Sequence, residues 1–204
     1  AAQQMQQDVI LSKYQALQKG LDFDAPKYLM EAFRHVLLDD ASDPALVAEA
    51  ITLPSLKGMT VDMHDVDVNL LYQAKDWLVT ELVKNLQVEL LSVYNQNFQS
   101  GEYQVTPAQV AKRSLKNRCL WYLMHSGQKE MQQLCFDQYE QSNNYTDRIT
   151  ALTLLAHQQV PGHEALLEAY YQTWKYNALM VNKWLSIQAT VPKPGCLEQV
   201  KTLM

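Results

Sequence analysis

Glycine and cysteine are scarce in this chain, and no unbroken apolar run is long enough to cross a membrane. With only six glycines and 48% hydrophobic residues in 204, the composition favours a soluble, helix-rich protein without a membrane segment. The formal net charge of -5 argues against non-specific binding to nucleic acid, which needs a basic surface to neutralise phosphates. We therefore expect neither nucleic acid nor a membrane among the partners.

The three cysteines, Cys119, Cys135 and Cys196, are an odd number at long, irregular spacings. This pattern predicts neither a disulfide framework nor a zinc knuckle, and it indicates reduced thiols in a cytoplasmic protein. Cys119 and Cys135 have large apolar neighbours, which favours burial as core side chains with a raised pKa over a nucleophilic role. The first residues, AAQQMQQ, lack the basic and apolar regions of a signal peptide.

Helix start signals recur along the chain. Asp43-Pro44 and Thr106-Pro107 each combine a capping oxygen with a proline, whose missing N–H is not needed in the first helical turn. Between Val66 and Phe98 no glycine or proline interrupts a helical apolar pattern, which predicts the longest helix. That pattern consists of Leu71, Ala74, Leu78, Leu82, Leu86, Leu90 and Val93.

Two further apolar faces indicate amphipathic helices near the end of the chain. One contains Ile149, Leu152, Leu155 and Ala156, and the other contains Leu179, Trp184 and Ile187. Short breaks at glycine and proline separate about ten such segments, and no strict internal period is visible. We therefore predict a single all-α domain over 1–204, an irregular superhelix of antiparallel helical hairpins like those of armadillo or HEAT proteins.

Histidines and acidic residues give no metal site. His163-Glu164 begins like a zinc-peptidase helix, but the position four after His163 is Leu167, and the Pro161-Gly162 break separates His157. The acidic group Asp62, His64, Asp65 and Asp67 does not have the order of a calcium loop, so we expect it to cap the following long helix.

Charged pairs and clusters are interpreted as surface features. Glu31 and His35 lie four apart, as do Lys112 and Lys116, a spacing typical of helix surface pairs. The basic cluster of Lys112, Arg113, Lys116 and Arg118 is expected to form a solvated face or an inter-domain contact. Asn144-Tyr145-Thr146 matches a glycosylation sequon, but Thr146 as a helix N-cap with Asp147 in the first turn is the better interpretation.

Two motifs in the last third of the chain carry a family resemblance. The block NNYTD begins at Asn143, and the block NKWLSIQAT ends at Thr190. Together they resemble the carboxy-terminal helical domain of bacterial aminopeptidase N, the zinc alanyl aminopeptidase family, which has Asn-Asn-Met-Thr-Asp and Asp-Lys-Trp-Phe-x-x-Gln-Ala there. The resemblance extends to Asp43–Ser55, Glu89–Val105, Val110–Leu120 and the final PGCLEQVKTLM.

The chain differs from the family at Tyr145, Asn182 and Leu185, where methionine, aspartate and phenylalanine are usual. It also has no His-Glu-x-x-His and no Gly-x-Met-Glu-Asn, the family's zinc and amino-terminus-binding motifs. The resemblance therefore implies a non-catalytic, truncated domain that packs against the catalytic domain of the same polypeptide and encloses its substrate chamber. The parent enzyme would use zinc to remove amino-terminal residues from peptides.

No residue of this chain is assigned as catalytic, cofactor-binding or metal-ligating. Trp184 is expected to pack between helices, whereas Lys183, about 100° away around the helix, should reach solvent or the catalytic domain. Self-association of the fragment through its carboxy-terminal helices, whose apolar surface is expected to be uncovered, is a further expectation. The alternative function is a free-standing helical-repeat scaffold, which should present a polar capping helix at each end.

Overall fold

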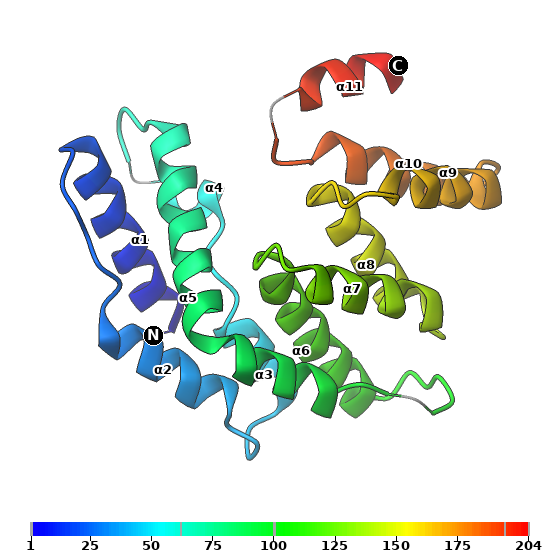
Figure 1. The fold of residues 1–204 in the computed structure, drawn as a ribbon, viewed down its shortest axis with the longest axis horizontal. Coiled ribbons are helices and arrows are strands. Elements are labelled where there is room, and N and C mark those ends of the chain that lie inside the picture. Colours follow the sequence, from blue (N-terminus) through cyan, green and yellow to red (C-terminus); the bar gives the residue numbers. More distant parts are fainter. Residues whose placement is uncertain (1, 62, 100, 194, 204) are drawn as a thin grey trace. The chain divides into compact units, whose positions relative to one another are not determined.

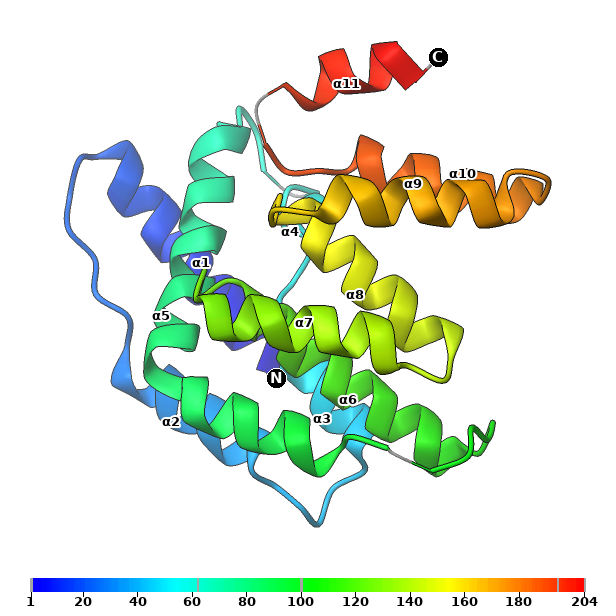
Figure 2. The same ribbon diagram turned by 45° about the vertical axis from the view of Figure 1, so that its right-hand side comes forward.

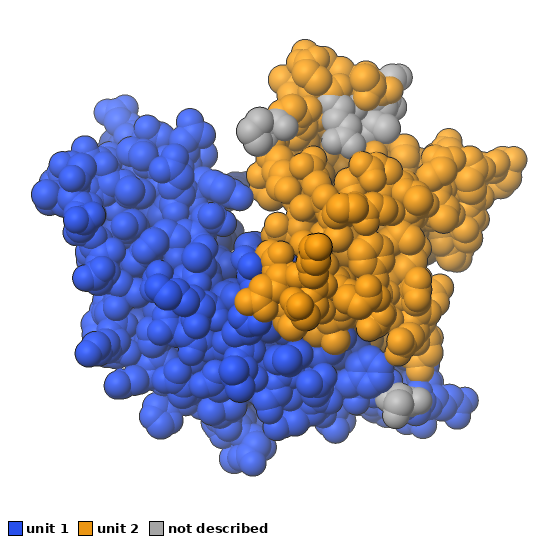
Figure 3. Space-filling view, in the orientation of Figure 1, with its two compact units in different colours: residues 1–126 blue, residues 127–204 orange. Residues whose placement is uncertain are grey.

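The computed structural model describes residues 2–61, 63–99, 101–193 and 195–203, and within them every regular element is a helix. The chain divides into two compact units, residues 1–126 and residues 127–204, which Figure 3 shows in different colours. Each unit has its own set of packed helices.

The first unit is organised around one long helix. Its helices are α1 (Ala2–Gln18), α2 (Lys27–Leu37), α3 (Pro44–Ala50), α4 (Leu56–Met59), α5 (Val68–Gln96) and α6 (Pro107–Met124). Helix α5 packs against α1, α2 and α6, and α6 also packs against α3. Figures 1 and 2 both show α1 beside α5. The core of this unit therefore surrounds the longest helix of the chain.

Helix α5 confirms the prediction made from the apolar pattern. All seven apolar residues from Leu71 to Val93 named above are buried. The Asp67 carboxylate caps the helix by accepting hydrogen bonds from the backbone N–H groups of Asn69 and Leu70 at 2.9 and 3.1 Å. This confirms the expected capping role for Asp67 alone among the members of the acidic group that the structure describes; Asp62 lies outside the described residues.

Both proline-marked helix starts are also confirmed. The Asp43 side chain accepts from the Ala45 N–H at 2.7 Å at the start of α3, and Thr106 accepts from the Gln109 N–H at 3.3 Å at the start of α6. In each helix proline occupies the first helical position, where no intrahelical donor is required.

Polar contacts join the helices of the first unit. The Arg34 guanidinium on α2 donates to the Glu89 carboxylate at 2.8 Å and to the Asn85 carbonyl at 3.1 Å, both on α5. The Tyr122 hydroxyl on α6 donates to the carbonyl of Ile51 just after α3. Because Tyr122 and Ile51 are fully buried, this bond satisfies polar groups that would otherwise lose their contact with water.

The second unit contains α7 (Lys129–Gln141), α8 (Tyr145–His157), α9 (His163–Trp174), α10 (Ala178–Ala189) and α11 (Cys196–Leu203). Helix α8 packs against α7, α9 and α10, while α11 packs against α10. Short connections join α7 to α8 and α9 to α10. The connection from α8 to α9 ends at Gly162, which has a left-handed backbone, φ 96°, immediately before α9.

The predicted all-α fold built from helical pairs is thus confirmed. The extent of a single domain over 1–204 stays a prediction. Among the described residues, no helix combines the length and the apolar character that crossing a membrane requires.

Candidate functional site

The NNYTD block forms the cap of α8. The Asn144 side-chain oxygen accepts from the Asp147 N–H at 2.9 Å, and its amide donates to the Asp147 carboxylate at 2.9 Å. The prediction that Thr146 is the N-cap is wrong, because α8 begins at Tyr145 and Thr146 already lies inside it. The expected place of Asp147 in the first turn is confirmed.

The same block ties α7 to α8 through buried groups. Gln138, on α7 and 1% exposed, donates from its side-chain amide to the Asp147 carbonyl at 3.0 Å. The Cys135 thiol of α7 donates to the Ala151 carbonyl of α8 at 3.5 Å. The cap, the amide and the thiol together fix the relative position of these two helices.

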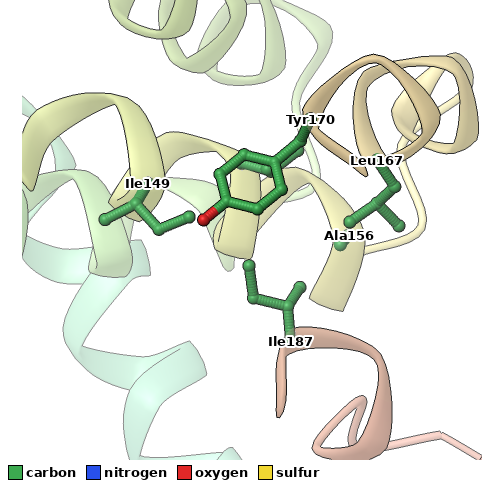
Figure 4. Packing of buried hydrophobic residues seen from close by; sticks show 6 residues of the cluster. Ile149, Ala156, Leu167, Tyr170 and Ile187 are labelled. Atoms are coloured by element: carbon green, nitrogen blue, oxygen red, sulfur yellow. The ribbon is translucent and has the colours of Figure 1, made fainter. Parts of the chain in front are cut away.

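A hydrophobic cluster holds α8, α9 and α10 together. Its buried members are Ile149, Leu152, Ala156, Leu167, Tyr170 and Ile187. In Figure 4 the Tyr170 ring lies among the aliphatic side chains with its hydroxyl directed toward Ile149. The apolar face predicted on α8 is confirmed, since all four of its residues are buried. Leu179, predicted on the buried face of α10, is instead 78% exposed.

Trp184 packs against this cluster from α10 and is half-buried. Its indole N–H donates to the Leu167 carbonyl at 3.0 Å, and its ring lies 4.7 Å from the ring of Tyr171 between centroids. Lys183 is exposed, as predicted. The inter-helical role of Trp184 is therefore confirmed, although its burial is only partial.

A cavity of about 350 Å³ opens beside the cap of α8. Its lining includes Tyr139 of α7, Tyr145 of α8, and Tyr170 and Trp174 of α9. The hydroxyls of Tyr145 and Tyr170 lie 2.9 Å apart, and the Tyr170 hydroxyl is also 3.4 Å from the Met180 sulfur. Three helices, α7, α8 and α9, thus each contribute a tyrosine hydroxyl to the cavity lining.

Tyr139 and Tyr170, which line this cavity, remain neutral at physiological pH because their pKa values are raised. Burial, reinforced by the hydrogen bond with Tyr145, raises the pKa of Tyr170 well above its ordinary value. Burial likewise raises the pKa of Tyr139. Their hydroxyls therefore act as hydrogen-bonding groups and add no negative charge.

Arg148 is the only charged side chain among the described residues that line the cavity. Its guanidinium donates through Nη2 to the Ser142 carbonyl at 2.9 Å, at the end of α7. This bond holds a cation at the exposed rim of an otherwise neutral cavity. No pattern in the sequence predicts this arrangement, because Tyr139, Arg148 and Tyr170 come from three helices and match no motif.

Two histidines of this unit, His157 and His163, contact backbone carbonyls through their ring nitrogens. His163 Nδ1 lies 2.9 Å from the Val160 carbonyl, and His157 Nε2 lies 3.1 Å from the Ile187 carbonyl. Over the described parts of the chain, no group of three histidine, cysteine or carboxylate side chains could hold a metal ion. The residues present therefore do not fit the zinc site that the family resemblance implies for a parent enzyme.

The basic cluster on α6 was predicted to form a solvated face or an inter-domain contact; the solvated face is wrong for Arg113 and Lys116, and the inter-domain contact stays a prediction. Arg113 is 5% and Lys116 2% exposed, while Lys112 is exposed. Arg113 stacks on the Tyr103 ring at 5.1 Å and Lys116 on the Phe98 ring at 5.2 Å, so the connection from α5 to α6 covers both cations. The predicted Lys112–Lys116 surface pair is therefore wrong, whereas Glu31 and His35 are both exposed.

The expected burial of two cysteines is confirmed. Cys119 and Cys135 are fully buried, and all three thiols are free. Desolvation raises the pKa of Cys119 to about 12, and it also raises the pKa of Cys135. Neither thiol is thus a thiolate at neutral pH, which a cysteine nucleophile needs.

The whole of residues 1–204 matches the family model described as "Domain of unknown function (DUF3458_C) ARM repeats". The chain belongs to this family. The aminopeptidase N of Escherichia coli K12 is 37% identical over 187 residues, covering 92% of this chain and 21% of the relative. The aminopeptidase N of Haemophilus influenzae Rd is 26% identical, covering 100% of this chain and 22% of the relative.

A solved structure agrees with these sequence relatives. The crystal structure of Legionella pneumophila aminopeptidase A in complex with aspartic acid matches with a TM-score of 0.85 and 25% identity, covering 100% of this chain and 24% of that one. The resemblance to the helical domain of aminopeptidase N is therefore confirmed. The chain spans about a fifth of the length of the curated relatives it matches.

Proposed function

We propose that this chain is the non-catalytic helical domain of a zinc metallo-aminopeptidase, packing on the catalytic domain of the same polypeptide and enclosing its substrate chamber. The observation that carries the proposal is the match of nearly the whole chain to one fifth of aminopeptidase N at 37% identity. The parent enzyme would remove amino-terminal residues from peptides in the cytoplasm. Free thiols at Cys119 and Cys135 are compatible with that reducing compartment.

The residues described here contribute structure and not bond cleavage. Zinc in the parent would activate water for attack on the scissile carbonyl, and its ligands would come from outside this chain. The tied α7–α8 pair and the cluster around Tyr170 give a rigid wall. Such a wall can exclude water and restrict a chamber to flexible peptides, which is a role in access and not in chemistry.

A chimera tests the proposal. In it, this chain replaces the matching fifth of the Escherichia coli aminopeptidase N, and hydrolysis of an alanyl chromogenic substrate is measured. We expect activity close to that of the parent, because the helix surfaces of this chain that meet the catalytic domain would be similar in shape and chemistry to those they replace. A control chimera carries an unrelated helical-repeat segment of the same length and should be inactive.

The chain alone completes the test. Purified free of any full-length enzyme, it should neither hydrolyse the substrate nor retain stoichiometric zinc. Hydrolysis by the chain alone would overturn its non-catalytic role. An inactive, correctly folded chimera would overturn the proposed packing and would favour the alternative of a free-standing helical-repeat scaffold.

A further inference from the structure

We propose that the cavity between α7, α8 and α9 binds an apolar carboxylate, such as the carboxy-terminal residue of a peptide or a free aryl carboxylate. Its volume of about 350 Å³ lies within the range of small-molecule sites, roughly 300–1,000 Å³. It therefore has room for one aromatic or large aliphatic residue. The proposal does not rest on the enzymatic role proposed above, because binding to this chain alone tests it.

The inner wall of the cavity suits an apolar group. Ile149 and Leu152, buried members of the hydrophobic cluster, line the cavity together with Trp174, which is 37% exposed. Covering the exposed part of Trp174 with an aromatic ring would remove apolar area from water, which is favourable by roughly 25 cal/mol per Å². The ring of such a ligand would also lie within reach of the tyrosine rings that line the same space.

The positive charge of Arg148 favours a ligand with a carboxylate group. Arg148 supplies the only charge among the described lining residues, and its Nη2 bond to the Ser142 carbonyl fixes the guanidinium at the rim. A guanidinium has five N–H donors in a planar fork that matches the two oxygens of a carboxylate. The neutral state of Tyr139 and Tyr170 means that no lining anion opposes this contact.

The same pattern disfavours a free amino acid. An ammonium group beside the carboxylate needs an acidic partner, and no carboxylate lines the cavity in the part of the chain described. A peptide carboxy terminus has an amide at this position instead. That amide can hydrogen-bond to the Tyr145 and Tyr170 hydroxyls, which lie 2.9 Å apart in the lining.

A matched series of ligands tests the chemistry by calorimetry and by amide chemical-shift changes in the full chain. N-acetyl-phenylalanine should bind with a Kd of about 1 mM, the range expected for so small a ligand. Its uncharged amide and zwitterionic phenylalanine should each bind at least ~5-fold more weakly. Equally tight binding of 3-phenylpropionate would indicate free carboxylates as the source, whereas weaker binding would indicate peptide termini.

Variants locate the binding site. Arg148→Gln should weaken binding of N-acetyl-phenylalanine at least ~5-fold, because the charge-assisted contact is lost. Lys183→Gln removes an exposed cation outside the cavity and should have no effect. Ala169→Phe fills the cavity from α9 while leaving Arg148 in place, and it should abolish binding. Circular dichroism melts confirm that each variant is folded.

Any of three binding results would overturn the proposal, and so would the absence of binding. They are equal affinity for the acid and its amide, unchanged affinity of the folded Arg148→Gln variant, and chemical-shift changes that map away from Tyr139, Tyr145 and Tyr170. Absence of binding up to about 10 mM, well above the expected Kd, would also overturn it.

Discussion

Asn144 stabilises α8 in two ways, since its side chain accepts from the Asp147 N–H and donates to the Asp147 carboxylate. We expect Asn144→Ala to lower the free energy of unfolding by about 1 kcal/mol, the usual loss for a helix N-cap. Thr146→Ala should lower it by less than ~0.5 kcal/mol, because Thr146 is exposed within the first turn. Urea denaturation of both variants gives the comparison, and equal losses would contradict the assignment of the cap.

Trp184 and its neighbour Lys183 provide a second contrast between single residues. Trp184→Ala removes a half-buried ring and a hydrogen bond to the Leu167 carbonyl, so we expect a loss of about 2–3 kcal/mol. This is below the cost of deleting a fully buried tryptophan, because part of the ring already contacts water. Lys183→Ala should change stability little, and thermal melts that shift alike for the two variants would refute this view of α10.

Some residue environments were beyond prediction because they depend on contacts distant in sequence. A lysine four positions from another on a helix is ordinarily solvated, so nothing local identifies Lys116 as buried. Its environment arises because the connection from α5 to α6 places Phe98 against it. Leu179 is the opposite case, an apolar residue that is exposed. It has helical spacing from Trp184 and Ile187, yet it lies in the first turn of α10, beyond the edge of the cluster.

At the scale of elements, local signals sufficed wherever the cause of the structure is local. Capping residues and prolines predicted the starts of α3 and α6. An uninterrupted apolar pattern predicted α5, which was expected over Val66–Phe98 and spans Val68–Gln96 in the structure. The cavity at Arg148 had no such signal. It arises from how α7, α8 and α9 pack against one another, and no periodicity within one helix encodes that packing.

His157 connects two elements, because its ring on α8 bonds the Ile187 carbonyl near the end of α10. Burial, partly offset by that bond, lowers the pKa of His157 below its ordinary value. The folded state therefore binds this proton less readily than the unfolded chain. Its contribution to stability should be complete above about pH 6.5 and should decrease as the pH falls below that value.

The His157→Gln variant tests this pH dependence. Its free energy of unfolding should fall less steeply between about pH 7 and pH 5 than that of the unaltered chain, since one titrating group is gone. His125, whose pKa burial also lowers, remains in both proteins and cancels in the comparison. Identical slopes would mean that His157 does not titrate differently in the folded state.

At the scale of the whole molecule, the family model extends across residues 1–204 while the helices form two compact units. The resemblance rested on motifs in both units, at Glu89–Val105 and Asn143–Thr190, and so pointed to one evolutionary module. Composition alone would have predicted only that the protein is helical. The family assignment needed specific residues such as Asn143, Asn144 and Lys183-Trp184, which periodicity cannot distinguish from other helix-forming sequences.

Self-association is the prediction that concerns the molecule as a whole. Tyr176, between α9 and α10, is 95% exposed, and Leu179, in the first turn of α10, is 78% exposed; such neighbouring apolar groups favour association. We expect the isolated chain to associate between about 10 µM and 1 mM, and the double variant Tyr176→Ser, Leu179→Ser to associate less. Val88→Ser, an equally exposed position on α5, serves as the control and should not alter association. Sedimentation velocity across this range measures the effect, and an unaltered chain that stays monomeric throughout, or a double variant that associates as strongly, would show that these two residues do not form an association surface.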